Sequence, residues 1–206
     1  MTDTSQSDAR DALSRVYRAY FNFCTTPDRD CVFALLSALH SLHDRCPPET
    51  REFLFSRSEF VSLKALRNYF QHEAEVRHRL KVVPANKYPI ITDLFILCLV
   101  DRAVVDAAID AIPEKRRAVE RTQAEQCFKW YGPCVNINPA ILNLIAALTL
   151  HVMESGLEPD EPAYAKMVQQ IEWEKAHGHE HFVTGDIACH AANVDAVFAE
   201  ILAKDE

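Results

Sequence analysis

The segment LKALRNYFQHEAEV, which begins at Leu63, holds side chains suited to proton transfer and charge neutralisation. Within it, Arg67 is followed by the polar Asn68 and, five residues after the arginine, by His72. A histidine with an unperturbed pKa of about 6.5 exchanges protons at neutral pH, and a guanidinium presents a planar fork of donors to an oxyanion. Arg67 and His72 are therefore the first candidates for chemistry.

Arg67 stands at an unusual place on the helix that this segment predicts. At about 100° per residue, Leu63, Leu66 and Phe70 form a core-facing stripe, and Arg67 falls inside it, at about 40° from Leu63. A charge there requires an ionic partner, a wet cleft or a subunit interface. His72 falls about 140° from Arg67. The two can share a site only if the helix bends or ends between them, or if a second subunit contributes.

The stretches that the prolines separate carry helical periodicity and not strand alternation, so the sequence predicts an all-helical protein. The sequence predicts a first helix from Ser7 to Cys24. A second helix, capped by Thr26 and opened by Pro27, is expected to stop before Pro47.

A capping box of Ser56 and Glu59 is predicted to open the helix that carries Arg67. The apolar run PIITDLFILCLV, which begins at Pro89, predicts a buried central helix that continues or restarts up to Pro113. Further helices are expected over 114–130, from Asn138 onward, and over about 161–176 and 186–203. The stretch FKWYGPCVNINP suggests an aromatic corner that staples two helices, with a ligand pocket as the alternative.

The segment RNYFQH, from Arg67 to His72, resembles the R-x4-6-H signature of the HEPN superfamily, whose arginine is commonly followed by a polar residue. The helix order is similar too, because two long helices precede this segment and a buried one follows. The resemblance implies an all-α helical bundle of about four or five helices. In a single helical domain of residues 1–206, it places a HEPN-like core at about 8–112 and a helical extension at about 113–206.

The resemblance also implies a function, that of a metal-independent endoribonuclease working as a homodimer. His72 would be the general acid and base when the RNA 2'-hydroxyl attacks its neighbouring phosphate, Arg67 would hold that phosphate, and Asn68 would orient a group or line the cleft. No cofactor is required. Such proteins commonly serve as toxins or phage-defence effectors, so the expected partners are RNA, a second copy, and an antitoxin or other protein.

The segment from Lys64 to Lys81 carries five cations against Glu73 and Glu75, a net of +3 in a chain of net charge -8. This local excess predicts contacts with RNA backbone phosphates, with a solvated basic loop as the alternative. The cations expected to contact RNA in addition to Arg67 are Lys64, Arg77, Arg79 and Lys81.

A second cluster of polar side chains is HGHEH, which contains His177, His179 and His181. With His190 and Glu180 these histidines are candidates for a zinc or nickel site. Because no cysteine or carboxylate pair stands at ligand spacing and a glycine interrupts the run, a flexible loop after a helix is the favoured interpretation, and no resident metal is expected.

Composition limits the remaining function classes. The 206 residues are 49% hydrophobic, enough for a real core, and a pI near 5.6 argues against coating nucleic acid through bulk positive charge. Four glycines leave no glycine-rich loop for a phosphate. Seven cysteines without a CxxC pair indicate buried thiols, although a cysteine and histidine nucleophile stays open. With no signal peptide or membrane span predicted, we expect a soluble cytoplasmic protein.

The main alternative is a non-catalytic helical bundle that binds a protein partner or a nucleotide. In that case Arg67 would form a structural ion pair between helices and His72 would be an ordinary surface histidine. The geometry of the two side chains distinguishes the hypotheses.

Overall fold

Helices make up most of the protein in the computed structural model, which describes residues 3–73, 78–190 and 193–204. The fold is 68% helical. The N-terminal helices are α1 (Asp3–Thr25), α2 (Arg29–Arg45), α3 (Pro48–Ser56) and α4 (Ser58–His72). The later helices are α5 (Arg102–Asp110), α6 (Glu114–Cys127), α7 (Asn138–Ser155), α8 (Pro162–Ala176) and α9 (Val194–Ala203).

The first two helices confirm the periodicity, but the cap between them differs from the prediction. Asp28 is the N-cap of α2, and its carboxylate accepts a hydrogen bond from the backbone N–H of Cys31 at 2.6 Å. The expected cap, Thr26, lies outside the helix because Asp28 satisfies the free N–H groups more directly. The helix ends at Arg45, before Pro47, as predicted.

Helix α4 starts later than the predicted capping box would place it. The hydroxyl of Ser56 donates to the carbonyl of Phe53 at 2.7 Å, which ends α3, and Arg57 is the N-cap of α4 without a side-chain cap bond. The capping-box prediction is therefore wrong. Helix α4 ends at His72, where the backbone N–H of Glu73 donates to the carbonyl of Tyr69 at 2.9 Å.

A four-stranded antiparallel sheet replaces the expected central helix, so the fold is α+β and not all-α. The strands are β1 (Leu80–Pro84), β2 (Ile96–Asp101), β3 (Lys129–Trp130) and β4 (Cys134–Asn136), in the order β1-β2-β4-β3. A short 3-10 helix, η2 (Ala85–Lys87), follows β1.

Strand β2 was mistaken for a helix because both of its faces are buried. Leu97 and Leu99 pack in one hydrophobic cluster with α9, whereas Cys98 and Val100 belong to the main helical core. A strand that is covered on both sides reads as a continuous apolar run without alternation, which periodicity alone does not separate from a buried helix. The physical cause of the error is this double burial.

The predicted aromatic corner is a β-hairpin. Trp130 ends β3, and the chain turns through Gly132 into β4, whose Asn136 is fully buried. The side-chain oxygen of Asn136 accepts from the backbone N–H groups of Cys98 at 3.1 Å and Asn138 at 3.2 Å. Asn136 therefore joins the sheet to the start of α7.

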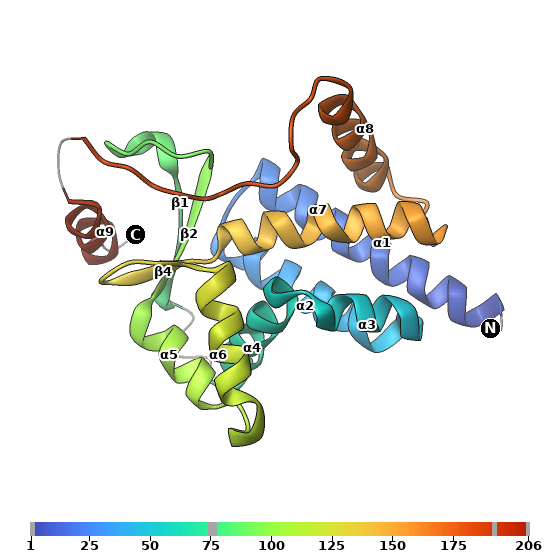
Figure 1. Cartoon of the computed structure of the whole chain (residues 1–206), viewed down its shortest axis with the longest axis horizontal. Coiled ribbons are helices and arrows are strands. Elements are labelled where there is room, and N and C mark those ends of the chain that lie inside the picture. The colour runs from blue at the N-terminus through green and yellow to red at the C-terminus, as the bar shows by residue number, and fades with distance from the viewer. Residues whose placement is uncertain (1–2, 74–77, 191–192, 205–206) are drawn as a thin grey trace.

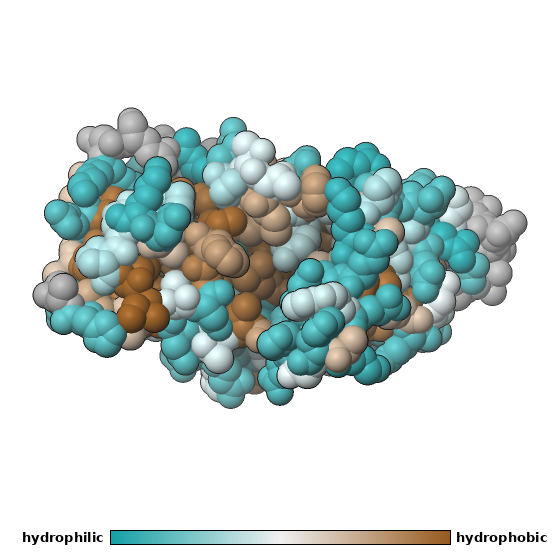
Figure 2. All heavy atoms as spheres, turned by 90° about the horizontal axis from the view of Figure 1, so that it is seen from above, coloured by the Kyte–Doolittle hydropathy of each residue, from teal (hydrophilic) through white to brown (hydrophobic). Residues whose placement is uncertain are grey.

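Figure 1 shows the helical layer on one side of the sheet and α9 on the other, with the long segment after α8 crossing to reach α9. The predicted last helix begins only at Val194, and Ala188, inside the predicted range, forms a β-bridge with Ile91 instead. Seen from above, hydrophobic side chains gather in the middle and left of the face, among polar ones (Figure 2). No helix among the described residues is long and apolar enough to cross a membrane.

Candidate functional site

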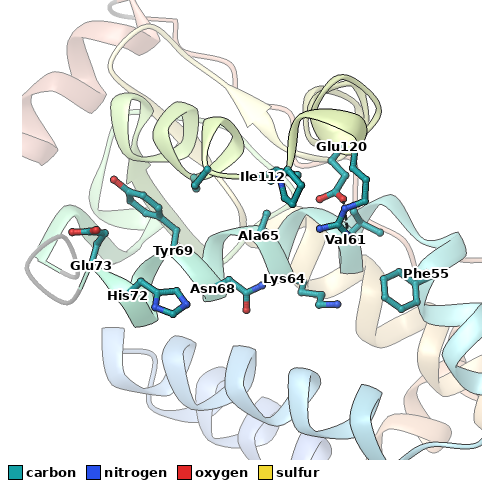
Figure 3. Close-up of a pocket in the computed structure, with 14 residues that line it drawn as sticks. Phe55, Val61, Lys64, Ala65, Asn68, Tyr69, His72, Glu73, Ile112 and Glu120 are labelled. Carbon is teal, nitrogen blue, oxygen red and sulfur yellow. Dashed lines mark ion pairs between the residues drawn. The ribbon is translucent and has the colours of Figure 1, made fainter.

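A cleft of about 360 Å³ lies between α4 on one side and α5 and α6 on the other. Its floor is apolar, with Val61, Ala65 and Ile112 among the lining residues. Figure 3 shows its polar groups along α4 and α6. The polar or charged residues of the lining include Lys64, Asn68, His72, Glu73, Arg116 and Glu120.

One row of α4 supplies three of these side chains. Lys64, Asn68 and His72 are spaced four residues apart, so each lies about 40° around the helix from the one before it. Figure 3 shows them following one another along the same side of α4. The structure therefore brings Asn68 and His72 together with Lys64, which the sequence assigned to RNA binding.

Arg67 is not part of the cleft. Its side chain is half-buried and donates to the amide oxygen of Asn68 at 3.2 Å; no described carboxylate lies within ion-pair distance of it. Burial, followed by the positive charge of Arg67, lowers the pKa of His40 on α2. Arg67 thus lies toward α2, whereas His72 lies on the α5 and α6 side.

The position of Arg67 explains how α4 tolerates a charge next to its core-facing stripe. Arg67 stands at the boundary between α2 and α4, where a half-buried guanidinium keeps some contact with water and avoids the full cost of burial. The interhelical salt bridge of the alternative hypothesis is not found for it among the described residues. Helix α4 does end at His72, but the end does not bring Arg67 into the cleft.

Two cations converge in the cleft with incomplete compensation. Burial and then the charge of Arg116 lower the pKa of Lys64, and the opposing effects of Asp44 and Glu120 do not cancel this shift. Arg116 forms an ion pair with Glu120 at 3.4 Å. The ammonium of Lys64 lies 4.6 Å from the centroid of the Phe55 ring, and no described carboxylate is within 4 Å of it. A bound anion would relieve the repulsion between the two cations.

Two groups able to transfer protons stand at the other end of the cleft. His72 is the last residue of α4 and Glu73 is its C-cap, and both side chains are exposed. Both line the cleft. In Figure 3 they lie at the end away from Phe55, with Asn68 between. Figure 3 shows the His72 ring turned toward Asn68 and the Glu73 carboxylate turned the other way. An imidazole and a carboxylate at the same end of a cleft can act as an acid and a base.

The other cations predicted to contact RNA have structural partners. Arg79 pairs with Asp101 at 2.9 Å, next to the end of β2. Lys81 donates to the backbone carbonyls of Ile201 at 3.4 Å and of Lys204, so it binds the C-terminal end of α9. These contacts hold both side chains to the fold. Arg77 lies outside the described residues.

The histidine-rich segment wraps around the end of α8. The ring of Trp173 stacks with His177 at 4.2 Å and with His179 at 5.9 Å between ring centroids, while His181 pairs with Glu174. Within the described ranges, no group of three or more histidines, cysteines or carboxylates is close enough to bind a metal ion. His177 and His179 therefore share Trp173 as their partner, whereas His181 is held by Glu174.

Several cleft residues could not be chosen from the sequence. Phe55 comes from α3, and Arg116 and Glu120 come from α6, which packs against α4 only in the folded chain. A usable signal was the spacing of Lys64 and Asn68 in the row that ends at the candidate histidine. Nothing in the local sequence of α6 distinguishes Arg116 from the other charged residues of that helix.

Comparisons of the chain with protein-family profiles, curated protein sequences and solved structures gave no significant match.

Proposed function

We propose that the protein is a metal-independent endoribonuclease and that the cleft between α4, α5 and α6 is its active site. The observation that carries the proposal is the cleft itself, in which His72 and Asn68 share a row with Lys64 and a second cation, Arg116, lies opposite. RNA is a chain of phosphates, and cations that line the same cleft as a proton-transfer group suit it. The resemblance to HEPN proteins supports the same chemistry.

The proposed reaction is a transesterification within the RNA. Glu73 takes the proton of the 2'-hydroxyl, and the 2'-oxygen forms a bond to the adjacent phosphorus. The bond from phosphorus to the 5'-oxygen breaks, and protonated His72 donates a proton to that leaving oxygen. The products are a 2',3'-cyclic phosphate and a 5'-hydroxyl, and the reaction needs no oxidant, metal or co-reactant. Asn68, between the two ends of the cleft, donates to a non-bridging phosphate oxygen.

Arg67 requires a second copy to enter this site. We propose a homodimer across the exposed side of α4, in which Arg67 of one copy reaches the phosphate held beside His72 of the other. Mixing inactive His72→Ala protein with inactive Arg67→Ala protein tests this arrangement. Sites built from both copies should recover about a quarter of the wild-type activity, because half of the random dimers contain one intact site. No recovery would contradict the shared site.

The nuclease proposal is tested with purified protein and end-labelled single-stranded RNA in a chelator. Wild-type protein should cleave, and His72→Ala should lower kcat by about 10² to 10⁴. The matched control is His190→Ala, because His190 is also exposed but does not line the cleft. Failure to cleave any RNA, or equal rates for wild type and His72→Ala, would contradict the proposal.

The position of Arg67 favours a second candidate function, a non-catalytic module that binds a nucleotide or an acidic partner in the cleft. Binding uses Lys64 and Arg116 but does not need Arg67 beside His72. This function predicts RNA binding that depends on Lys64, without cleavage and without an effect of His72→Ala.

A further inference from the structure

Phe55 forms the end of the cleft opposite His72. It belongs to α3, and its side chain is 40% exposed although it is a large hydrophobic residue. Perpendicular ring contacts with His43 at 5.0 Å and with Phe60 at 5.7 Å between centroids hold the ring in place. The ring is thus held in a fixed orientation, partly exposed and with the ammonium of Lys64 over it.

The two ends of the cleft have different chemistry. Lys64 and His72 are eight residues apart on α4, which separates their backbones by about 12 Å along the helix axis. In Figure 3 the side chain of Lys64 extends toward Phe55 and away from His72. A phosphate held by Lys64 and Arg116 is therefore not the phosphate that reacts beside His72.

An aromatic ring next to paired cations is suited to an unpaired nucleotide. Single-stranded nucleic acid is bound by cations that follow its backbone and by aromatic rings on which its bases stack. In a duplex the bases are stacked inside the helix and cannot reach such a ring.

We infer that Phe55 is a stacking platform for an unpaired nucleobase whose phosphate is held by Lys64 and Arg116, so that the enzyme selects single-stranded RNA. This inference rests on the proposed function and extends it, because it separates a binding subsite from the reacting groups at His72 and Glu73. Lys64 now covers the Phe55 ring, and it turns to the phosphate when the base takes its place.

The experiment measures binding separately from cleavage. The probe is a fluorescent single-stranded RNA with 2'-O-methyl groups, which cannot be cleaved because its 2'-oxygen is blocked. Phe55→Ala should raise its Kd by about 5- to 150-fold, whereas Phe55→Trp should retain binding. The matched control, Phe95→Ala, removes a phenylalanine that is 91% exposed and outside the cleft, and should leave Kd unchanged.

Two further probes identify stacking as the cause. An oligonucleotide without bases should bind weakly to wild-type protein and equally weakly to Phe55→Ala, and a duplex of the same sequence should bind more weakly than the single strand. With cleavable RNA, Phe55→Ala should raise KM and leave kcat unchanged.

The outcomes separate the inference from the nuclease proposal. Three results would overturn the inference even if RNA is cleaved. They are equal Kd values for wild type and Phe55→Ala, a loss of affinity in Phe55→Ala that is as large for the base-free probe as for the RNA, and tighter binding of the duplex than of the single strand. Absence of cleavage with Phe55-dependent binding would overturn only the nuclease proposal. No binding of any single strand by the wild-type protein would overturn both.

Discussion

Lys64→Met should weaken RNA binding without lowering the stability of the protein. Burial and the nearby charge of Arg116 lower the pKa of Lys64 in the folded state. The folded protein therefore holds this proton less tightly than the unfolded chain, and at neutral pH the charged amine reduces the free energy of unfolding. That cost disappears as pH rises toward the unfolded pKa of about 10.4. Methionine preserves most of the apolar packing and removes the charge.

The matched control is Lys166→Met, because both lysines stand over a phenylalanine ring. The ammonium lies 4.6 Å from the ring centroid for Lys64 and Phe55, and 4.3 Å for Lys166 and Phe21. Each substitution loses a cation–π contact of about 0.5–1 kcal/mol. At Lys64, relief of charge burial and of the repulsion by Arg116 offsets this loss. We expect Lys166→Met to lose about 0.5–1 kcal/mol and Lys64→Met to be neutral or slightly stabilised.

Lys64→Met should weaken RNA binding although it does not destabilise the fold. Loss of one charge-assisted contact of about 1.5–3 kcal/mol raises the Kd for single-stranded RNA by roughly 10- to 150-fold. The slope of log K against log salt should fall by about 0.7 for the lost phosphate contact. Urea unfolding gives the stabilities, and fluorescence anisotropy over a range of salt gives the slope. Equal destabilisation of both variants, or unchanged binding by Lys64→Met, would refute the anion-binding cleft.

Two further predictions concern the fold. Gly185→Ala should lower the free energy of unfolding by about 2–5 kcal/mol in thermal or urea unfolding, because φ is +70° and a Cβ would lie 2.2 Å from Cγ of Pro139. Gly178→Ala, at φ +72° with open space, should lose only about 1 kcal/mol, and equal losses would contradict the packing argument. Asp28→Ala should cost about 1 kcal/mol at pH 7. Hydrogen bonding to Cys31 lowers the pKa of Asp28 in the folded state. In urea unfolding at several pH values, the stability difference between wild type and Asp28→Ala should therefore be complete above about pH 4 and disappear as the pH falls through the lowered pKa. A difference that does not change with pH would contradict this role of Asp28.

The helices were predictable because their signals are local. The stop before Pro47 and the start of α7 at Asn138 follow from proline chemistry and an apolar stripe, and both are confirmed. The cap at Asp28 was missed since Thr26 and Asp28 are both good caps, and the choice depends on which side chain reaches a free backbone N–H. Which residue caps a helix therefore depends on the backbone geometry within a single turn.

The sheet and the cleft could not be predicted in the same way. Residues 96–101 lose strand alternation because α9 covers one face and the helical core covers the other, and that arrangement brings together distant segments. The row from Lys64 to His72 was visible in the sequence. The pairing of Lys64 with Arg116 depends on the packing of α6 against α4, which no local pattern encodes.

The most direct test of the proposed active site uses an RNA with one ribonucleotide in an otherwise 2'-deoxy strand, incubated with the protein in a chelator. We predict cleavage only after the ribonucleotide, with 2',3'-cyclic phosphate and 5'-hydroxyl ends, and a rate lowered by about 10² to 10⁴ in His72→Ala. Cleavage at deoxynucleotides, a 5'-phosphate product, or an unchanged rate in His72→Ala would contradict proton transfer by His72 in this cleft.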